Sequence, residues 1–196
     1  MSEKEILQMQ CTTALKEWAT VLEAMGRGEQ LVLIRKGGLI EPGSGFEVRA
    51  SSFLFYPTFE HQAVAYLRPA YQGYFEEAAK RRAADGQVRM ELFGVATASY
   101  AVRDPALIER LADVHIYNQA FLTQRLKWQP DQPLVLVVVR AYRLATPHVC
   151  PALPHYAGCK SWVDLESAVS VSGARPVLDD ATFQARTNVI ASALPS

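Results

Sequence analysis

The sequence predicts an α+β fold with a mixed or mostly antiparallel sheet and flanking helices. Segments with strand character come in clusters, around residues 31–35, 46–56, 88–102 and 134–144, and helical segments separate the clusters. A regular alternation of strand and helix is missing, which disfavours a doubly wound parallel sheet. The predicted mixed or mostly antiparallel sheet is also compatible with curling into a barrel.

The first half of the chain is expected to begin with an amphipathic helix over residues 14–25. Apolar residues recur there every three or four positions, and two glycines shortly afterwards supply a stop. A strand at 31–35 is apolar on both faces, so we expect it to be central in the sheet. The remaining expected elements of this half are short strands at 46–49 and 53–56, a helical turn at 57–62 and a helix at 71–81.

The second half carries the two strongest strand signals. One is the segment 88–102, in which Gly94 indicates a bulge or bend, and the other is the apolar run that opens 134–144. Asp104-Pro105 predicts a helix start, because aspartate caps helices and proline fits the first helical position. The other expected elements are a helix over 116–127, a proline-rich loop after 146, a helix starting at the capping box 161–164, and a final amphipathic helix over 180–194.

Composition indicates one globular domain spanning residues 1–196. Of the 196 residues, 49% are hydrophobic and 20% are charged, and no apolar run is long enough for a membrane span. The first residues lack the apolar segment of a secretion signal, and three cysteines do not make a disulfide framework, so a cytoplasmic location is expected. The formal net charge is zero, which disfavours nucleic-acid binding through bulk electrostatics.

The most site-like feature of the sequence is Arg35-Lys36-Gly37-Gly38, which ends an apolar strand. Two cations and the backbone N–H groups of a glycine turn can together hold one anion. The chain contains no GxxxxGK[ST] phosphate loop. The alternative is a surface hairpin with solvated cations.

Three residues are candidates for catalysis. His61 follows Glu60, and a histidine beside a carboxylate can act as a general base or donate a hydrogen bond to phosphate. Alternatively, His61 caps or packs a helical turn. Glu47 begins a Glu-Val-Arg sequence that echoes the acidic sites of metal-dependent nucleases, although arginine stands where lysine is usual and cannot transfer protons near neutral pH.

Four potential zinc ligands lie within a dozen residues, namely His148, Cys150, His155 and Cys159. Structural zinc sites prefer ligand pairs separated by two to four residues, and here one residue separates the first pair. Because three prolines also stiffen the segment, no metal site is expected. Cys159 precedes Lys160, which would lower the pKa of a reactive thiol, but a packed cysteine is the simpler interpretation.

Three stretches of the sequence resemble one protein family. They are residues 14–18 together with 33–38, the segment 53–62 (FLFYPTFEHQ), and 156–162 (YAGCKSW). They are similar to the bacterial domain-of-unknown-function family numbered 1802, over about residues 12–166. That family has no established activity, so the resemblance assigns no catalytic residue. Relatives joined to restriction-type endonuclease domains imply an association with DNA defence.

A second resemblance is to ASCH domains, which are PUA-like barrels that bind RNA or modified nucleotides. Gly28 and Arg35 match the first and last positions of the GxKxxExR signature, whereas Gln30 and Leu33 replace its lysine and its glutamate. This resemblance implies a PUA-like barrel as one form of the sheet.

We therefore expect a binding module for a nucleotide or a nucleic-acid segment. In it Arg35 and Lys36 contact phosphate, His61 donates a hydrogen bond, and Arg143 or Lys160 serves as a further cation. Two alternatives from other classes stay open. One is a metal-dependent, nuclease-like enzyme associated with DNA defence. The other is a non-catalytic structural partner in a complex, docked through the C-terminal helix. The sequence indicates no cofactor.

Overall fold

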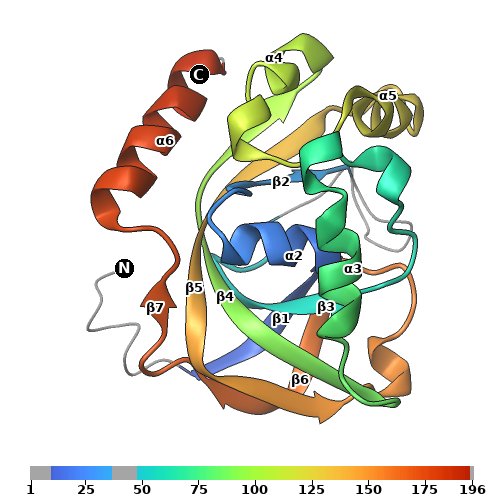
Figure 1. Cartoon of the computed structure of the whole chain (residues 1–196), viewed down its shortest axis with the longest axis vertical. Helices are drawn as coiled ribbons and strands as arrows, with labels where there is room; N and C mark the ends of the chain where they lie inside the picture. The colour runs from blue at the N-terminus through green and yellow to red at the C-terminus, as the bar shows by residue number, and fades with distance from the viewer. Residues whose placement is uncertain (1–9, 37–47, 195–196) are drawn as a thin grey trace.

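The computed structural model of the chain describes residues 10–36 and 48–194 (Figure 1). Its strands are β1 (Gln10–Trp18), β2 (Val32–Arg35), β3 (Ser52–Thr58), β4 (Gln87–Val102), β5 (Leu134–Pro151), β6 (Trp162–Ser170) and β7 (Arg175–Pro176). Its helices are α2 (Ala19–Gly26), α3 (Gly73–Lys80), α4 (Pro105–Glu109), α5 (Gln119–Lys127) and α6 (Asp180–Ala193). Short 3-10 turns lie at Val64–Tyr66, Pro69–Tyr71, Ala112–Val114 and Pro154–Tyr156.

The described strands form one mixed sheet in the order β2-β5-β4-β3-β1-β6, with β7 beside β5. All pairs are antiparallel except β1 with β3. The predicted α+β class, with a mixed and mostly antiparallel sheet, is therefore confirmed. Among the residues described, β2 and β6 do not pair with each other, so the sheet is open rather than closed into a barrel.

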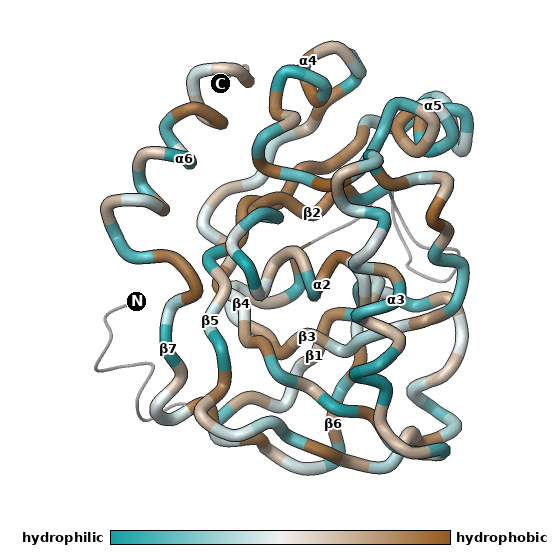
Figure 2. The backbone as a smooth tube through the Cα atoms, viewed as in Figure 1, coloured by the Kyte–Doolittle hydropathy of each residue, from teal (hydrophilic) through white to brown (hydrophobic). Residues whose placement is uncertain are grey.

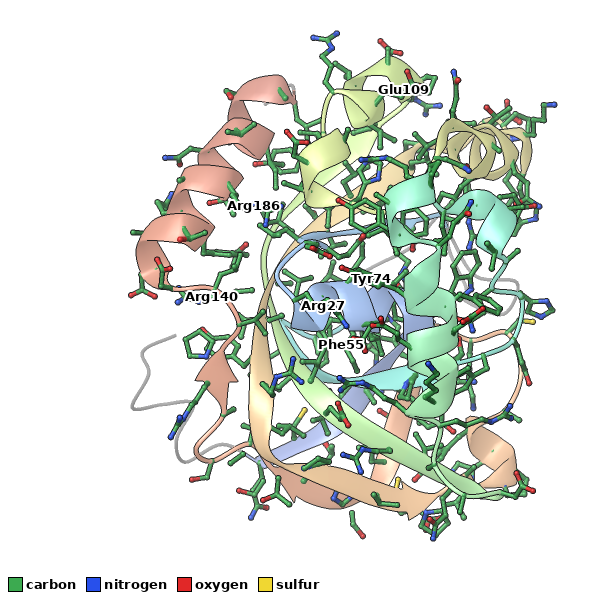
Figure 3. All side chains as sticks on the ribbon, in the orientation of Figure 1. Arg27, Phe55, Tyr74, Glu109, Arg140 and Arg186 are labelled. Carbon is green, nitrogen blue, oxygen red and sulfur yellow. The ribbon has the colours of Figure 1, made fainter. Side chains whose placement is uncertain are left out.

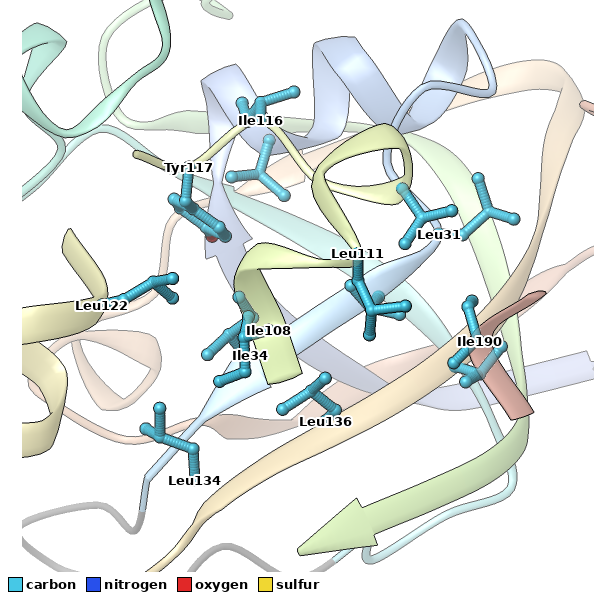
Figure 4. Close-up of a cluster of buried hydrophobic side chains, with 14 of the residues drawn as sticks. Leu31, Ile34, Ile108, Leu111, Ile116, Tyr117, Leu122, Leu134, Leu136 and Ile190 are labelled. Atoms are coloured by element: carbon cyan, nitrogen blue, oxygen red, sulfur yellow. The ribbon is translucent and has the colours of Figure 1, made fainter. Parts of the chain in front are cut away.

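The sheet curls around α2, and α3 crosses in front of that helix (Figure 1). Apolar segments follow the strands, while polar segments lie mainly on the outer helices and connections (Figure 2). The largest group of buried apolar side chains joins β2 and β5 to α4, α5 and α6. It includes Leu31, Ile108, Leu136 and Ile190 (Figure 4). The cleft described in the next subsection is lined by other residues.

Gly94 in β4 is required by close packing. A Cβ atom at this position would lie 2.7 Å from the ring of Phe55 and 2.9 Å from a methyl group of Val139. The register of β4 against β5 shifts on either side of Gly94, between Met90 and Leu92 and between Ala96 and Ala98, rather than at the glycine. The bulge predicted at Gly94 is therefore wrong in its position, although β4 is irregular on both sides of that residue.

The helix expected over 14–25 is a strand in its first part. β1 continues to Trp18 and α2 begins at Ala19. Ala14 and Leu15 are both buried, in two different apolar clusters, because β1 lies between β3 and β6 and has protein on both faces. Burial on both faces removes the alternation of polar and apolar residues by which a strand is recognised.

Other local predictions were also wrong, including the central position expected for the strand at 31–35, because β2 stands at one end of the strand order. The segment 161–164 begins β6 instead of a helix, and β5 continues through most of the expected proline-rich loop to Pro151. Pro147 is tolerated because it lies where β5 bulges relative to β4. The expected helical turn at 57–62 is absent, because β3 continues to Thr58 and residues 60–61 form a bend, and 48–50 form no strand.

The final helix, α6, lies close to the range expected from the sequence and packs outside the sheet (Figure 1). Its Arg186 donates hydrogen bonds to the backbone carbonyls of Gly28 and Asp113, while Leu178, just before the helix, packs against Gly28. In the two described ranges, no helix combines the length and the apolar character needed to span a bilayer.

Candidate ligand-binding cleft

A cleft of about 350 Å³ is lined by Phe55, which Figure 3 labels, and by residues that follow α3. Its walls come from α2, the end of β3, the connection from α3 to β4, and the segment between β5 and β6. This volume falls in the range of small-molecule sites in proteins. Charged residues and aromatic rings line different parts of it.

At the charged end, three arginines converge on Glu91, and we call Glu91 with Arg81, Arg89 and Arg143 the Glu91 cluster. The Glu91 carboxylate lies 2.5 Å from Nε of Arg89, 3.1 Å from Nη1 of Arg81 and 3.8 Å from Nη1 of Arg143. Burial opposes ionisation of Glu91, but the hydrogen bonds and charges of Arg89 and Arg81 outweigh it and lower the pKa of this carboxyl.

A second carboxylate joins the cluster to α2. Glu23 is buried, and its carboxylate lies 3.1 Å from Nε of Arg81 and 2.8 Å from Nη2 of Arg27. Arg27 also pairs with Glu77 on α3. Four guanidinium groups therefore share three carboxylates in this network, which leaves a surplus of positive charge at the cleft.

Aromatic rings also line the cleft, and we call the part formed by Tyr56, Phe59 and Tyr156 the aromatic end. The rings of Tyr56 and Tyr156 meet edge to face with centroids 6.1 Å apart. The guanidinium carbon of Arg82 lies 5.0 Å from the centroid of Phe59, a cation–π contact. Burial raises the pKa of Tyr56 to about 12, so its phenol stays neutral at physiological pH.

Lys16 brings a cation to this aromatic end. Its ammonium nitrogen lies 5.7 Å from the centroid of Tyr56 and donates a hydrogen bond of 3.0 Å to the carbonyl of Gly158. Burial lowers the pKa of this lysine, the positive charge of Lys160 lowers it further, and Glu60 opposes the shift. The two ends of the cleft thus differ, with clustered arginines at one and rings with single cations at the other.

Of the residues expected to form a site, Glu60 and Arg143 line this cleft. Lys160 lies close enough to act on the charge of Lys16, and its own ammonium donates to the carbonyl of His155. His61 is exposed, with a positive φ of 60°, and does not line the cleft.

The strand-end cations lie elsewhere. Nη2 of Arg35 is 2.9 Å from the carboxylate of Glu17 and 2.6 Å from the carbonyl of Lys16. Lys36 is only 4% exposed and donates a hydrogen bond of 2.9 Å to the carbonyl of Leu126, and its burial lowers its pKa. The other expected site residues of this region, Gly37, Gly38 and Glu47, lie outside the described residues.

The four weak zinc candidates are distributed along β5 and the connection to β6. His148 and Cys150 lie in β5 opposite Met90 and Val88, while His155 and Cys159 are exposed. A search of residues 10–36 and 48–194 finds no group of three or more histidine, cysteine, aspartate or glutamate residues arranged to hold a metal ion.

Most of the residues that line the charged end escaped the sequence-based prediction. Arg81 follows α3 and resembles the solvated end of an amphipathic helix. Arg89 and Glu91 alternate along β4, which places both on one face of the strand. That alternation could have indicated a pair between Arg89 and Glu91. The approach of Arg143 to the same carboxylate depends on the register between β4 and β5, which the sequence does not show.

The fold and the cleft together define an α+β domain with an open mixed sheet and an arginine-rich cleft on one side of it. The chain belongs to the family described as Domain of unknown function (DUF1802), whose family model matches residues 14–189. The match confirms the family suggested by the sequence and extends it beyond residue 166 into α6. A search of curated proteins and a search of solved structures each found no match.

Proposed function

We propose that the protein is a binding module for a nucleotide-sized ligand that carries a phosphate, held in the cleft. The observation that carries this proposal is the convergence of three guanidinium groups on the single carboxylate of Glu91. Glu91 orients the three arginines, and even with Glu23 on Arg81 two carboxylates do not neutralise three guanidinium charges. A phosphate beside them would accept charge-assisted hydrogen bonds from guanidinium groups that already point to one place.

The aromatic end supports a nucleotide over inorganic phosphate. Tyr56, Phe59 and Tyr156 line the same cleft as the Glu91 cluster. Aromatic side chains stack on nucleobases, and arginine planes do so as well. A ligand with a phosphate at one end and a planar base at the other would use both ends of the cleft.

The charge and volume support a small ligand over a long nucleic-acid strand. The formal net charge is zero, whereas proteins that track a phosphate backbone usually present an extended basic surface. A cleft of about 350 Å³ suits one nucleotide. A nucleic-acid segment would bind through one terminal or extruded nucleotide.

Titration calorimetry with the ribonucleoside monophosphates and triphosphates, and with inorganic phosphate, tests this proposal. Arg89→Ala and Arg143→Ala should each weaken nucleotide binding by roughly ten- to a hundredfold, because each removes a charge-assisted hydrogen bond. Arg49→Ala is the matched control, since Arg49 is an exposed arginine paired with the single carboxylate of Asp164 away from the cleft. The Arg49→Ala variant should bind the nucleotides with the same affinity as the unsubstituted protein.

Two results would contradict the proposal. One is the absence of binding by every nucleotide and by phosphate. The other is undiminished binding by the Arg89 and Arg143 variants. The same titration with Lys36→Gln tests the sequence-based assignment of phosphate contacts to the Arg35-Lys36 segment. The nuclease-like and structural-partner alternatives stay predictions from the sequence.

A further inference from the structure

Phe59 and Arg82 form a cation–π contact at the aromatic end of the cleft, which we call the Phe59–Arg82 platform. The guanidinium group of Arg82 lies over the ring of Phe59 at 5.0 Å, and both residues line the cleft. A planar base can extend this stack, since nucleobases lie on aromatic rings and on guanidinium planes with similar ease. The platform therefore provides a position for a base but does not by itself distinguish one base from another.

Glu60 follows Phe59 directly and also lines the cleft. Its charge acts on both Lys16 and Tyr56, two residues that line the same cleft. Arginines hold the carboxylates of Glu23 and Glu91. By contrast, no ion pair to the carboxylate of Glu60 is found within the two described ranges. Glu60 is thus an exposed acceptor that lines the cleft and is the next residue in the chain after Phe59.

The donors at the aromatic end complement this acceptor. Lys16 lies over the ring of Tyr56, and Arg82 lies over Phe59, so two cations accompany the one carboxylate. An ionised carboxylate only accepts hydrogen bonds, and the two cations only donate them. The base that fits must present neighbouring donors to Glu60 and an acceptor to a cation.

Guanine has this arrangement. Its N1–H and exocyclic N2 amino group are adjacent donors that one carboxylate can accept together, and its O6 and N7 are acceptors of the kind that arginine and lysine recognise. Adenine and cytosine each place a ring acceptor beside their amino group, which would face the carboxylate unfavourably. Uracil has one N–H between two carbonyl oxygens.

We infer that the cleft selects guanine nucleotides, with Glu60 as the residue that determines specificity through the N1 and N2 edge of the base. This inference rests on the proposed function above. It adds an orientation, in which the phosphate lies at the Glu91 cluster and the base lies on the Phe59–Arg82 platform. It also adds a choice among bases, which the arginines alone do not make.

The test compares the affinities of GMP, IMP and AMP for the full chain by titration calorimetry. IMP lacks only the N2 amino group of GMP. The unsubstituted protein should bind GMP about tenfold or more tightly than IMP or AMP, because a bidentate pair discriminates by that factor or more. Glu60→Gln and Glu60→Ala should each remove this preference and leave the affinity for AMP unchanged.

Asp85→Asn is the matched control, because Asp85 is a second exposed carboxylate that lines the cleft. It should keep the preference for GMP. Urea unfolding of each variant verifies that an exposed substitution has left the fold intact. If Asp85→Asn removes the preference and Glu60→Gln does not, the assignment to Glu60 is overturned.

The outcomes separate the inference from the function on which it rests. If no nucleotide binds, both fail. If nucleotides bind and the Arg89 and Arg143 variants weaken them, but GMP, IMP and AMP bind equally, the guanine inference fails alone. Retention of the GMP preference by both Glu60 variants would sink it in the same way, while the proposed function would stand.

Discussion

Two arginine–carboxylate sites in this protein use the same chemistry in opposite ways. Glu17 and Arg35 form a buried pair, with side chains 6% and 18% exposed, and each also bonds the backbone, through the N–H of Trp18 and the carbonyl of Lys16. The Glu91 cluster gives one carboxylate three arginines, each roughly half exposed. The first site has matched charges and holds the fold. The second has excess positive charge facing a cleft.

The ratio of arginines to carboxylates and the burial of the side chains distinguish a structural ion pair from a candidate binding site. A buried pair is expensive to break because the remaining charge has no water. Exposed arginines around one carboxylate contribute little to stability but keep their hydrogen-bonding capacity for another anion. Substitutions at the two sites should therefore affect different measurements.

The largest expected effect is that of Glu17→Ala. This change takes the carboxylate from Arg35 and an acceptor from the N–H of Trp18, and should lower the free energy of unfolding by roughly 3–5 kcal/mol. Urea denaturation measures it. Asp164→Ala, which breaks the exposed pair with Arg49, should cost less than about 1 kcal/mol. Equal costs for the two variants would remove the distinction between the sites.

A buried histidine, His115, is expected to make the stability of the fold depend on pH. The ring of His115 lies 3.0 Å from the carbonyl of Ile108 and 3.1 Å from Nη2 of Arg68. Burial lowers the pKa of His115 from 6.5 to about 4, and the charge of Arg68 adds to this effect. Because the unfolded chain binds a proton that the folded chain does not, stability is complete above pH 6.5 and falls as the pH is lowered towards 4.

The expected loss over that interval is on the order of 3 kcal/mol. Urea denaturation at pH values from 4 to 7.5 measures it, and His115→Gln should flatten the dependence. The exposed His155 provides the control, since His155→Gln should leave the slope unchanged. A slope that persists in the His115 variant would assign the acid sensitivity to other groups.

The smallest expected effect on stability is that of Arg89→Ala. Its pair with Glu91 is partly exposed, and two other arginines remain on that carboxylate, so the free energy of unfolding should fall by less than about 1 kcal/mol. The same variant should lose nucleotide affinity in the titration described above. A loss of stability comparable to that of Glu17→Ala would make the Glu91 cluster structural and would weaken the comparison.

Local signals in the sequence predicted the elements whose neighbours lie nearby. Asp104 begins α4 as expected, and its side chain accepts a hydrogen bond of 2.9 Å from the N–H of Ala106. β4 and α6 also lie close to their expected positions, and β5 begins where it was expected but ends later. β1 and β6 were missed because their identity depends on each other and on β3, which are distant in the sequence.

The candidate site was predictable only in part, for a similar reason. Arg35 ends a strand, where a cation normally reaches solvent, but Glu17 from β1 meets it. Lys36 is covered in the same way, by the carbonyl of Leu126. The Glu91 cluster combines residues that follow α3 with residues of β4 and β5, so no local motif announces it. Contacts between elements that are distant in the sequence therefore determine which cations form buried contacts and which line the cleft.

The position of β1 between β3 and β6 has a consequence for how the protein folds. β1 lies near the beginning of the chain and β6 near its end, and they pair directly. At a synthesis rate of about 5–20 residues per second, β1 leaves the ribosome roughly ten seconds or more before its partner exists. Strands that are so far apart in the sequence also pair slowly. Until β6 arrives, one edge of β1 is an unpaired strand edge, which makes this interval the vulnerable stage of biogenesis.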